Sequence, residues 1–461
     1  MKNSVRVLSV LLAVLLTASC TSCSTDPAAS TASGTASGGT SDASSSTAAT
    51  LPPPPEFEMP EVNLTNKTVK CLSAAEFDDY QIRMHEGMLR DIGVTVENEV
   101  VPYDSLSTLL VQKITSGESP DIYAMTNRDF PSLVAREVFL PLDDYIDFSQ
   151  NIWEEQLPQL ERWKWKGKMY LNGGSSGVAR FVWYNTKIFK NADLPTPLEL
   201  YDKGEWDWDK LLELAQELTV EDAEGKVIQY GFAGESLQFT FRGSAGEDYI
   251  KFDENGITNN FRNPNVAKAE KFLQDLALTY KVLPPSDSMA NFDLFMQNKV
   301  AMGVYGHWYA FSAEGATARL KNGEIAFAPP PKAPGMEPYY YGDLSGILIP
   351  KGAPNPEGAA AYMTYRTYYG RVQETVDGKE VSPWMRTNIE AGWTDDMVRI
   401  YEEVNESPNI IAHLYHGVGN AISWAWEPYS KLMTGTPWET IVEEYAPKME
   451  QEIELFNSSL K

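Results

Sequence analysis

Aromatic side chains beside glycine and polar residues are the feature of this sequence that points most directly to chemistry. The chain has 12 tryptophans and 23 tyrosines among 461 residues. Their rings can cover the apolar C–H face of a sugar, while Asp, Asn, Glu and Arg side chains hydrogen-bond its hydroxyl groups. The candidates, each of which could instead pack in the core, are Trp206, Trp208, Trp308, Trp384, Trp424 and Trp426. Core packing is the weaker interpretation in YGHWY, SPWMRTN and ISWAWEP, so the pattern favours a carbohydrate ligand.

Catalytic motifs are missing from the sequence. There is no nucleophile elbow, phosphate-binding loop or cluster of metal ligands, and GGSSG at 173–177 lacks the lysine of a phosphate loop. Acidic pairs such as Asp78–Asp79 and Asp143–Asp144 could serve a glycosidase, but chance pairs are expected among 64 Asp and Glu residues. We therefore expect a non-enzymatic protein without cofactor or metal and keep a surface glycan hydrolase as an alternative.

The charge balance restricts the partners. A formal net charge of −26 repels phosphate backbones, which argues against nucleic acid and leaves neutral or cationic small ligands open. Hydrophobic residues make up 43% of the chain, enough for a sizeable core. Of the three cysteines, Cys71 lies in an apolar, strand-like run, and we expect its thiol to be buried.

The N-terminal residues predict a signal peptide over residues 1–19. Lys2 and Arg6 precede an apolar run at residues 7–18, which is too short to span a bilayer. The run ends in LTASC, which resembles a lipobox and implies cleavage before a diacylated Cys20. An ordinary secretory signal is the alternative interpretation.

Residues 20–60 predict a lipidated linker. Ser, Thr, Ala, Gly and finally Pro dominate this stretch, whose scarce apolar bulk cannot offset the entropy of ordering it. No later segment is apolar and long enough to be transmembrane, so we expect an anchored protein.

The remaining sequence alternates strand and helix patterns. Strands at 67–75, 94–101 and 121–126 are separated by amphipathic helices at 79–93 and 105–117, a βαβαβ opening that implies a parallel sheet. Further strands are expected at 180–185, 299–306 and 346–350, and further helices at 206–219, 265–280, 355–370 and 437–456. The fold class is therefore α/β.

Four segments together resemble the bacterial extracellular solute-binding family that includes maltose-binding protein. They are residues 114–145 (ITSGESPDIY…PLDDY), 167–194 (GKMYLNGG…NADL), 295–311 (FMQNKVAMGVYGHWYAF) and 346–365 (GILIPKGAPNPEGAAAYMTY). The resemblance covers the chain from about residue 67 onward, although Asn298 replaces the glycine usual in the third segment.

The resemblance implies a two-lobe periplasmic-binding-protein-like fold of type II, with the ligand cleft between the lobes and hinge crossover strands joining them. Crossovers are expected near 172–177, 342–346 and 405–413. Lobe 1 would comprise residues 62–172 plus 344–405, and lobe 2 residues 175–343 plus 410–461.

The resemblance also nominates site residues, because loops at the carboxyl ends of parallel strands face the ligand. These are Glu76, Phe77, Asp78, Thr126, Asn127, Arg128, Asp129, Arg180, Trp308, Asp343, Trp384, Arg386, Trp424 and Trp426.

By resemblance the protein is the substrate-binding subunit of an ABC importer. It would capture a mono- or oligosaccharide by hinge closure and deliver it to the permease, acting as a monomer anchored on the extracytoplasmic face of a Gram-positive membrane. Ferric iron, suggested by the tyrosines at 339–341, or a polyamine are alternative ligands, and a sensor subunit feeding a kinase is an alternative role.

Overall fold

The structure is a computed structural model that describes residues 59, 63–125, 129–161, 163–173, 176–253, 256–285, 290–376, 383–415 and 418–458, all within one unit, residues 54–461. The predicted signal peptide, Cys20 and nearly all of the linker lie outside the described residues, as do Thr126, Asn127 and Arg128.

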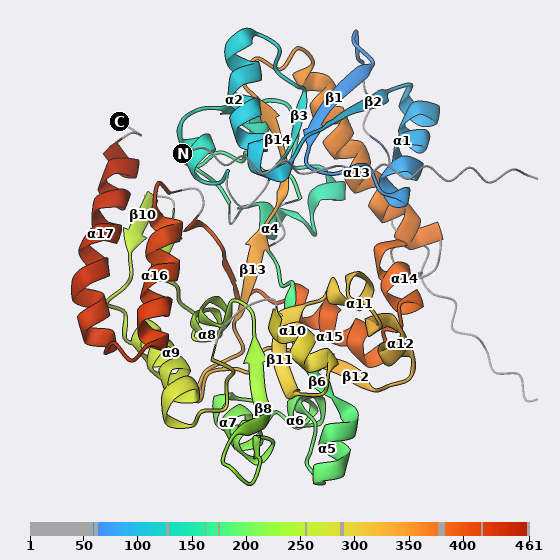
Figure 1. Ribbon diagram of the computed structural model, residues 1–461. Coiled ribbons are helices and arrows are strands. Elements are labelled where there is room, and N and C mark those ends of the chain that lie inside the picture. Colours follow the sequence, from blue (N-terminus) through green and yellow to red (C-terminus); the bar gives the residue numbers. More distant parts are fainter. Residues whose placement is uncertain are drawn as a thin grey trace, which may run out of the picture. The chain divides into compact units, whose positions relative to one another are not determined.

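The first sheet confirms the predicted βαβαβ opening. Its order is β2 (Thr95–Val100), β1 (Thr68–Ser73), β3 (Ile122–Met125), β14 (Gly346–Pro350) and β4 (Phe139–Leu140). β1 pairs in parallel with both β2 and β3, whereas β14 is antiparallel to β3. In Figure 1 the orange β14 and α13 (Pro356–Val376) lie among the blue elements, so a late segment of the chain completes this sheet.

Helices cover both faces of the first sheet. Successive side chains of a strand point to opposite faces. Val69 and Cys71 pack in one cluster with α1 (Asp79–Ile92) and α13, while Leu72 packs in another with α2 (Leu106–Ser116). The expected burial of Cys71 is confirmed, and this burial raises the pKa of its thiol to about 12.

Local capping sets the ends of these helices. Asp78 and Gln81 form a reciprocal capping box at the start of α1, and Gly93 ends it in the left-handed conformation at φ 71°. Asn355 begins α13 as expected, because its Oδ1 accepts a hydrogen bond from the Gly358 N–H at 3.0 Å.

The second sheet carries most of the candidate site. Its order is β12 (Ile325–Ala328), β6 (Arg180–Asn185), β11 (Val300–Gly306), β8 (Val227–Gly234) and β7 (Val220–Glu221). β11 is parallel to β8 and antiparallel to β6. All seven residues of β11 are buried, as expected for a strand covered on both faces. One face packs against α7 (Trp208–Glu217) and α9 (Pro264–Gln274), the other against α10 (Ala290–Met296) and α15 (Asp395–Asn405).

A small third sheet lies at the predicted crossovers. It contains β15 (Ile410–Ala412), β13 (Tyr340–Leu344) and β5 (Ser176–Gly177). β13 leads directly into β14 of the first sheet, and β5 directly precedes β6 of the second. β13 and β5 therefore connect the two larger sheets, and β15 pairs with β13 beside them.

The packing of α15 differs from the predicted lobe boundary at residue 405. Met397, Ile400 and Val404 share a hydrophobic cluster with Phe181 and Trp183 of β6. The amphipathic face of α15 is thus buried against the second sheet, and the prediction that placed this helix in the first lobe is wrong.

The remaining elements complete both halves. The C-terminal α17 (Trp438–Ser458) packs against α16 (Ala421–Met433) and the hairpin of β9 (Ile250–Asp253) and β10 (Gly256–Asn259). The shorter helices are η1 (Tyr103–Ser105), α3 (Ser132–Ala135), η2 (Leu142–Asp144), η3 (Asn151–Trp153), α4 (Leu157–Glu161), α5 (Thr186–Ala192), α6 (Pro197–Asp202), α8 (Leu237–Ser244), the π-helical η4 (Asp275–Thr279), α11 (Tyr309–Ser312), α12 (Ala316–Lys321) and α14 (Pro383–Glu390). None of the helices in the described part of the chain has the length and apolarity needed to span a bilayer.

Candidate ligand-binding site

Strand directions bring three side chains to one edge of the second sheet. Glu235 directly follows β8, and Trp308 lies two residues after β11, which runs parallel to β8. Arg180 begins β6, which runs the opposite way, and it pairs with Gly306 at the end of β11. The end of two strands and the start of the third therefore meet at the edge where α/β sheets usually bind ligands.

Arg180 joins this edge to the third sheet. Its Nε lies 3.4 Å from Glu235 Oε1, and its Nη1 lies 3.5 Å from Asp343 Oδ2 on β13. Asp343 Oδ1 in turn lies 3.4 Å from Nδ1 of His413, which follows β15. We call Arg180, Glu235, Trp308, Asp343 and His413 the Arg180 cluster. The side chain of Asp343 is 37% exposed and that of Arg180 24% exposed, so both remain accessible to a ligand.

Trp308 supplies an aromatic surface to the cluster. The Arg180 guanidinium carbon lies 5.4 Å from the centre of the Trp308 ring, within the range of a cation–π contact. A Cβ atom at Gly306 would collide with this ring, so glycine at that position lets the indole lie against the strand end. Burial, together with the nearby Arg180 charge, lowers the pKa of the neighbouring His307 to about 4 and keeps that imidazole neutral at pH 7.

A second exposed tryptophan connects to the cluster through Phe239. The Phe239 ring lies 5.1 Å from His413 and 5.3 Å from Trp426, which is 39% exposed. Trp424, two residues earlier, instead packs 6.2 Å from Tyr445 of α17, beneath the ammonium of Lys448. Of the two late aromatics predicted from the sequence, Trp426 is therefore the one connected to the Arg180 cluster.

The first sheet contributes a separate cavity of about 370 Å³ at the end of β1. Glu76 and Phe77 line it, as do Ser73, Tyr103 and Arg366. The loop after the first strand thus borders a cavity, whereas Arg366 in the middle of α13 was not predicted.

Two other nominated carboxylates have structural partners. Asp78 caps α1 and is absent from the described lining of the cavity. Asp129 is fully buried, and its Oδ2 accepts a hydrogen bond from the Tyr123 hydroxyl at 2.9 Å. Both contacts explain these residues without a ligand.

The remaining candidate residues are either buried in the core, exposed on α14 or outside the described residues. Trp206 and Trp208 are 3% and 1% exposed and donate hydrogen bonds to Pro329 O and Ser244 Oγ, so their interpretation as sugar-stacking rings is wrong. Arg386 is exposed on α14. Trp384 belongs to the same helix, but its side chain lies outside the described residues.

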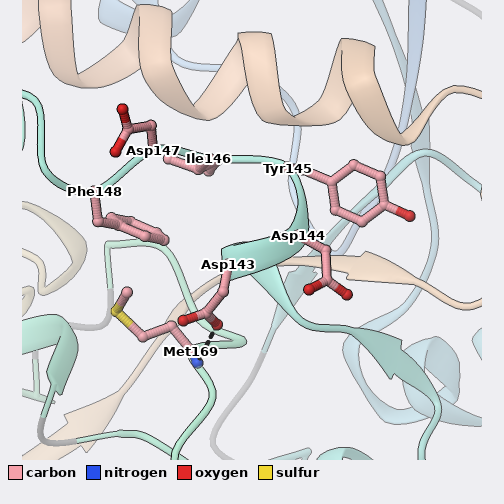
Figure 2. A pocket seen from close by; sticks show the side chains of 7 residues that line it. All are labelled: Asp143, Asp144, Tyr145, Ile146, Asp147, Phe148 and Met169. Atoms are coloured by element: carbon pink, nitrogen blue, oxygen red, sulfur yellow. Dashed lines mark hydrogen bonds between the residues drawn. The ribbon is translucent and has the colours of Figure 1, made fainter.

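The acidic pair at 143–144 lines a different cavity, of about 440 Å³. Asp143 Oδ2 accepts a hydrogen bond from the Met169 N–H at 2.7 Å, and Asp144 Oδ1 lies 3.5 Å from Lys168 Nζ. Figure 2 shows Asp147 turned away from both. Asp143 and Asp144 thus each have a partner within the chain.

Comparison with known proteins agrees with this architecture. The family model of the bacterial extracellular solute-binding protein matches residues 91–367. A curated binding protein of Brucella abortus is 25% identical over 277 residues, which span 58% of this chain and 63% of that relative.

Solved structures share the fold at low sequence identity. An extracellular solute-binding protein of Staphylococcus aureus in complex with maltose has a TM-score of 0.63 at 13% identity and covers 85% of this chain and 99% of its own. An ABC substrate-binding protein of Listeria monocytogenes in complex with cycloalternan has a TM-score of 0.61 at 16% identity and covers 84% and 100%. A maltose/maltodextrin-binding domain of Bdellovibrio bacteriovorus bound to maltotriose has a TM-score of 0.57 at 18% identity, with the same coverages.

The predicted type II periplasmic-binding-protein fold is thereby confirmed. Because the family model matches more than half of the residues, the chain belongs to the bacterial extracellular solute-binding protein family.

Proposed function

We propose that this protein captures a carbohydrate, a mono- or oligosaccharide, as the substrate-binding subunit of an ABC importer. The observation that carries the proposal is the Arg180 cluster, in which an indole ring lies beside accessible charged hydrogen-bonding groups. Rings that cover C–H faces and charged groups that bind hydroxyls are the complementary halves of a sugar site. Trp426 extends the aromatic side of this arrangement through Phe239.

The structural neighbours support this ligand class. Their complexes contain maltose, cycloalternan and maltotriose, which are all saccharides. A shared fold does not determine which ligand is bound. The side chains of the site in this chain determine which sugar it binds.

Hinge closure is the proposed mechanism. We take lobe 1 as residues 62–172 plus the segment from 344 through α13, and lobe 2 as residues 175–343 plus the segment from α15 to the C-terminus. A ligand that contacts both lobes stabilises the closed state by the contacts that the open state lacks. The closed form would then dock on the permease and release the sugar unchanged, without catalysis.

Membrane attachment is proposed from the N-terminal sequence. Cys20 would carry the lipid, and the linker at 20–60 would hold the binding domain, as a monomer, on the extracytoplasmic face of a Gram-positive membrane. The family description agrees with an extracellular location.

Titration calorimetry against a panel of mono- and oligosaccharides tests the proposal. We expect one-to-one binding of at least one saccharide, with the sugar recovered intact by chromatography. The absence of binding across the panel would contradict the carbohydrate assignment, and shortened products would favour the glycan hydrolase. Binding of ferric iron or a polyamine instead would identify one of the other ligand classes.

A further inference from the structure

A second cavity, of about 230 Å³, lies beside the first crossover and is rich in hydrogen-bond donors. Its lining consists of Asn172 and Gly173, which precede β5, of Arg366, Thr367, Gly370 and Arg371 of α13, and of Tyr80, Glu155 and Gln156. The Arg180 cluster contributes none of the described lining.

Arg366 is the central donor. It has no hydrogen bond or ion pair within the described part of the chain, although it lines both this cavity and the cavity beside Glu76. An added Cβ at Gly173 would lie 2.6 Å from Arg366 Nη1, and Gly173 has a φ of 73°. Glycine is thus required there both for the backbone conformation and for the approach of the guanidinium.

Asn172 adds a donor whose position is fixed. Asn172 is 1% exposed, and its side-chain Nδ2 has no hydrogen-bond partner among the described residues. Its backbone N–H and C=O both pair with Ile347 of β14 at 2.9 Å, so the main chain cannot move freely to satisfy the amide. A buried N–H without a partner destabilises the folded state, and an oxyanion that accepted a hydrogen bond from Nδ2 would remove that cost.

The charge of the cavity favours an anion. Arg371 already pairs with Glu155, which leaves the charge of Arg366 uncompensated in the described lining. An arginine without a counterion is notable in a chain with a formal net charge of −26. The guanidinium presents a planar set of donors that matches carboxylate, sulfate and phosphate oxygens.

We propose that this cavity binds an oxyanion, held by the Arg366 guanidinium and the Asn172 amide. The oxyanion can be a free inorganic ion or the acidic group of a saccharide guest. The site is independent of the Arg180 cluster, so its test does not depend on the carbohydrate proposal.

Calorimetric titration with sodium sulfate, at constant ionic strength in chloride, tests the site directly. We expect saturable one-to-one binding that weakens at least about tenfold in Arg366→Gln, because this change removes the charged donor of the proposed hydrogen bonds. Asn172→Asp, which replaces the amide donor by an acceptor of the same shape, should abolish binding. Arg83→Gln removes the same charge from an exposed position on α1 and should leave binding unchanged.

A competition experiment distinguishes the two possible sources of the oxyanion, a free inorganic ion and the acidic group of a sugar. If glucuronate or a uronate-containing oligosaccharide displaces sulfate while the neutral sugar does not, the anion belongs to the guest. If sulfate binds and none of these sugars displaces it, the ligand is a free inorganic anion. Both results support the site. Absence of saturable sulfate binding, or wild-type affinity for sulfate in the folded Arg366→Gln and Asn172→Asp proteins, would overturn it.

Discussion

Two tryptophans of α16 that are separated by one residue have different surroundings, and we assign sugar stacking to one and helix packing to the other. Trp426 is exposed beside Phe239, whereas Trp424 packs beside Tyr445. We expect Trp426→Ala to weaken saccharide binding about 5- to 10-fold, because a ring contact contributes about 1 kcal/mol beyond its buried area. Trp424→Ala is the matched control and should leave the dissociation constant unchanged. Equal losses in both variants, measured by calorimetry, would contradict the role assigned to Trp426.

His307 gives the stability a pH dependence. Its folded-state pKa of about 4 lies below the ordinary value of 6.5, so on acidification the unfolded state takes up a proton before the folded state does. The contribution of His307 to the free energy of unfolding is therefore fully present above pH 6.5 and is lost as the pH falls towards 4. We expect wild type to lose about 1–2 kcal/mol more than His307→Gln between pH 7 and pH 5 in urea unfolding. Parallel losses in the two proteins would show that His307 does not contribute.

At the scale of elements, a buried charge network joins α8 to α9. Arg242 of α8 is fully buried, with Nε 2.7 Å from Asp248 Oδ1 and Nη1 2.6 Å from Glu270 Oε1 on α9. Burial raises the pKa of Glu270, although Arg242 opposes that effect. The guanidinium therefore compensates two carboxylates inside the second half of the molecule.

Removing this guanidinium should be far more costly than removing an exposed one. We expect Arg242→Met to lower the free energy of unfolding by about 3–5 kcal/mol, because it leaves buried carboxylates uncompensated. Arg399→Met, which breaks the exposed pairs of α15 with Asp202 and Asp396, should cost about 1 kcal/mol or less. Similar denaturant midpoints for the two variants would contradict the structural role of the network.

The elements themselves could be predicted, because hydrophobic periodicity and caps are local. The capping residue Asn355 and the all-buried β11 are examples. The grouping of α15 with the second sheet could not be predicted, because the partner of an amphipathic face depends on long-range packing.

The candidate site was only partly predictable for a related reason. Arg180, Trp308 and Asp343 were nominated, and the structure brings them together. Glu235 and His413 were missed, because their convergence depends on the order of strands in the sheets. The Asp78-x-x-Gln81 spacing, in contrast, is a capping signature that the sequence already contained.

At the scale of the whole molecule, the proposed lipid anchor on Cys20 would determine where the binding domain works. We expect the wild-type protein, expressed in a Gram-positive host, to partition into the detergent phase of Triton X-114 and to incorporate labelled palmitate. Cys20→Ala should lose the label and appear in the medium or aqueous phase, because its only proposed membrane attachment is removed. Cys23→Ala is the matched control. Retention of the label in Cys20→Ala would contradict the assignment of the lipidated cysteine.

Closure of two lobes on a saccharide is the central claim, and small-angle X-ray scattering tests it most directly. The measurement compares the protein alone with the protein saturated by the tightest-binding sugar of the calorimetric panel. The account predicts a smaller radius of gyration on saturation and no change in a Trp308→Ala/Trp426→Ala protein at the same sugar concentration. Superimposable profiles of the free and fully saturated wild-type protein would contradict it.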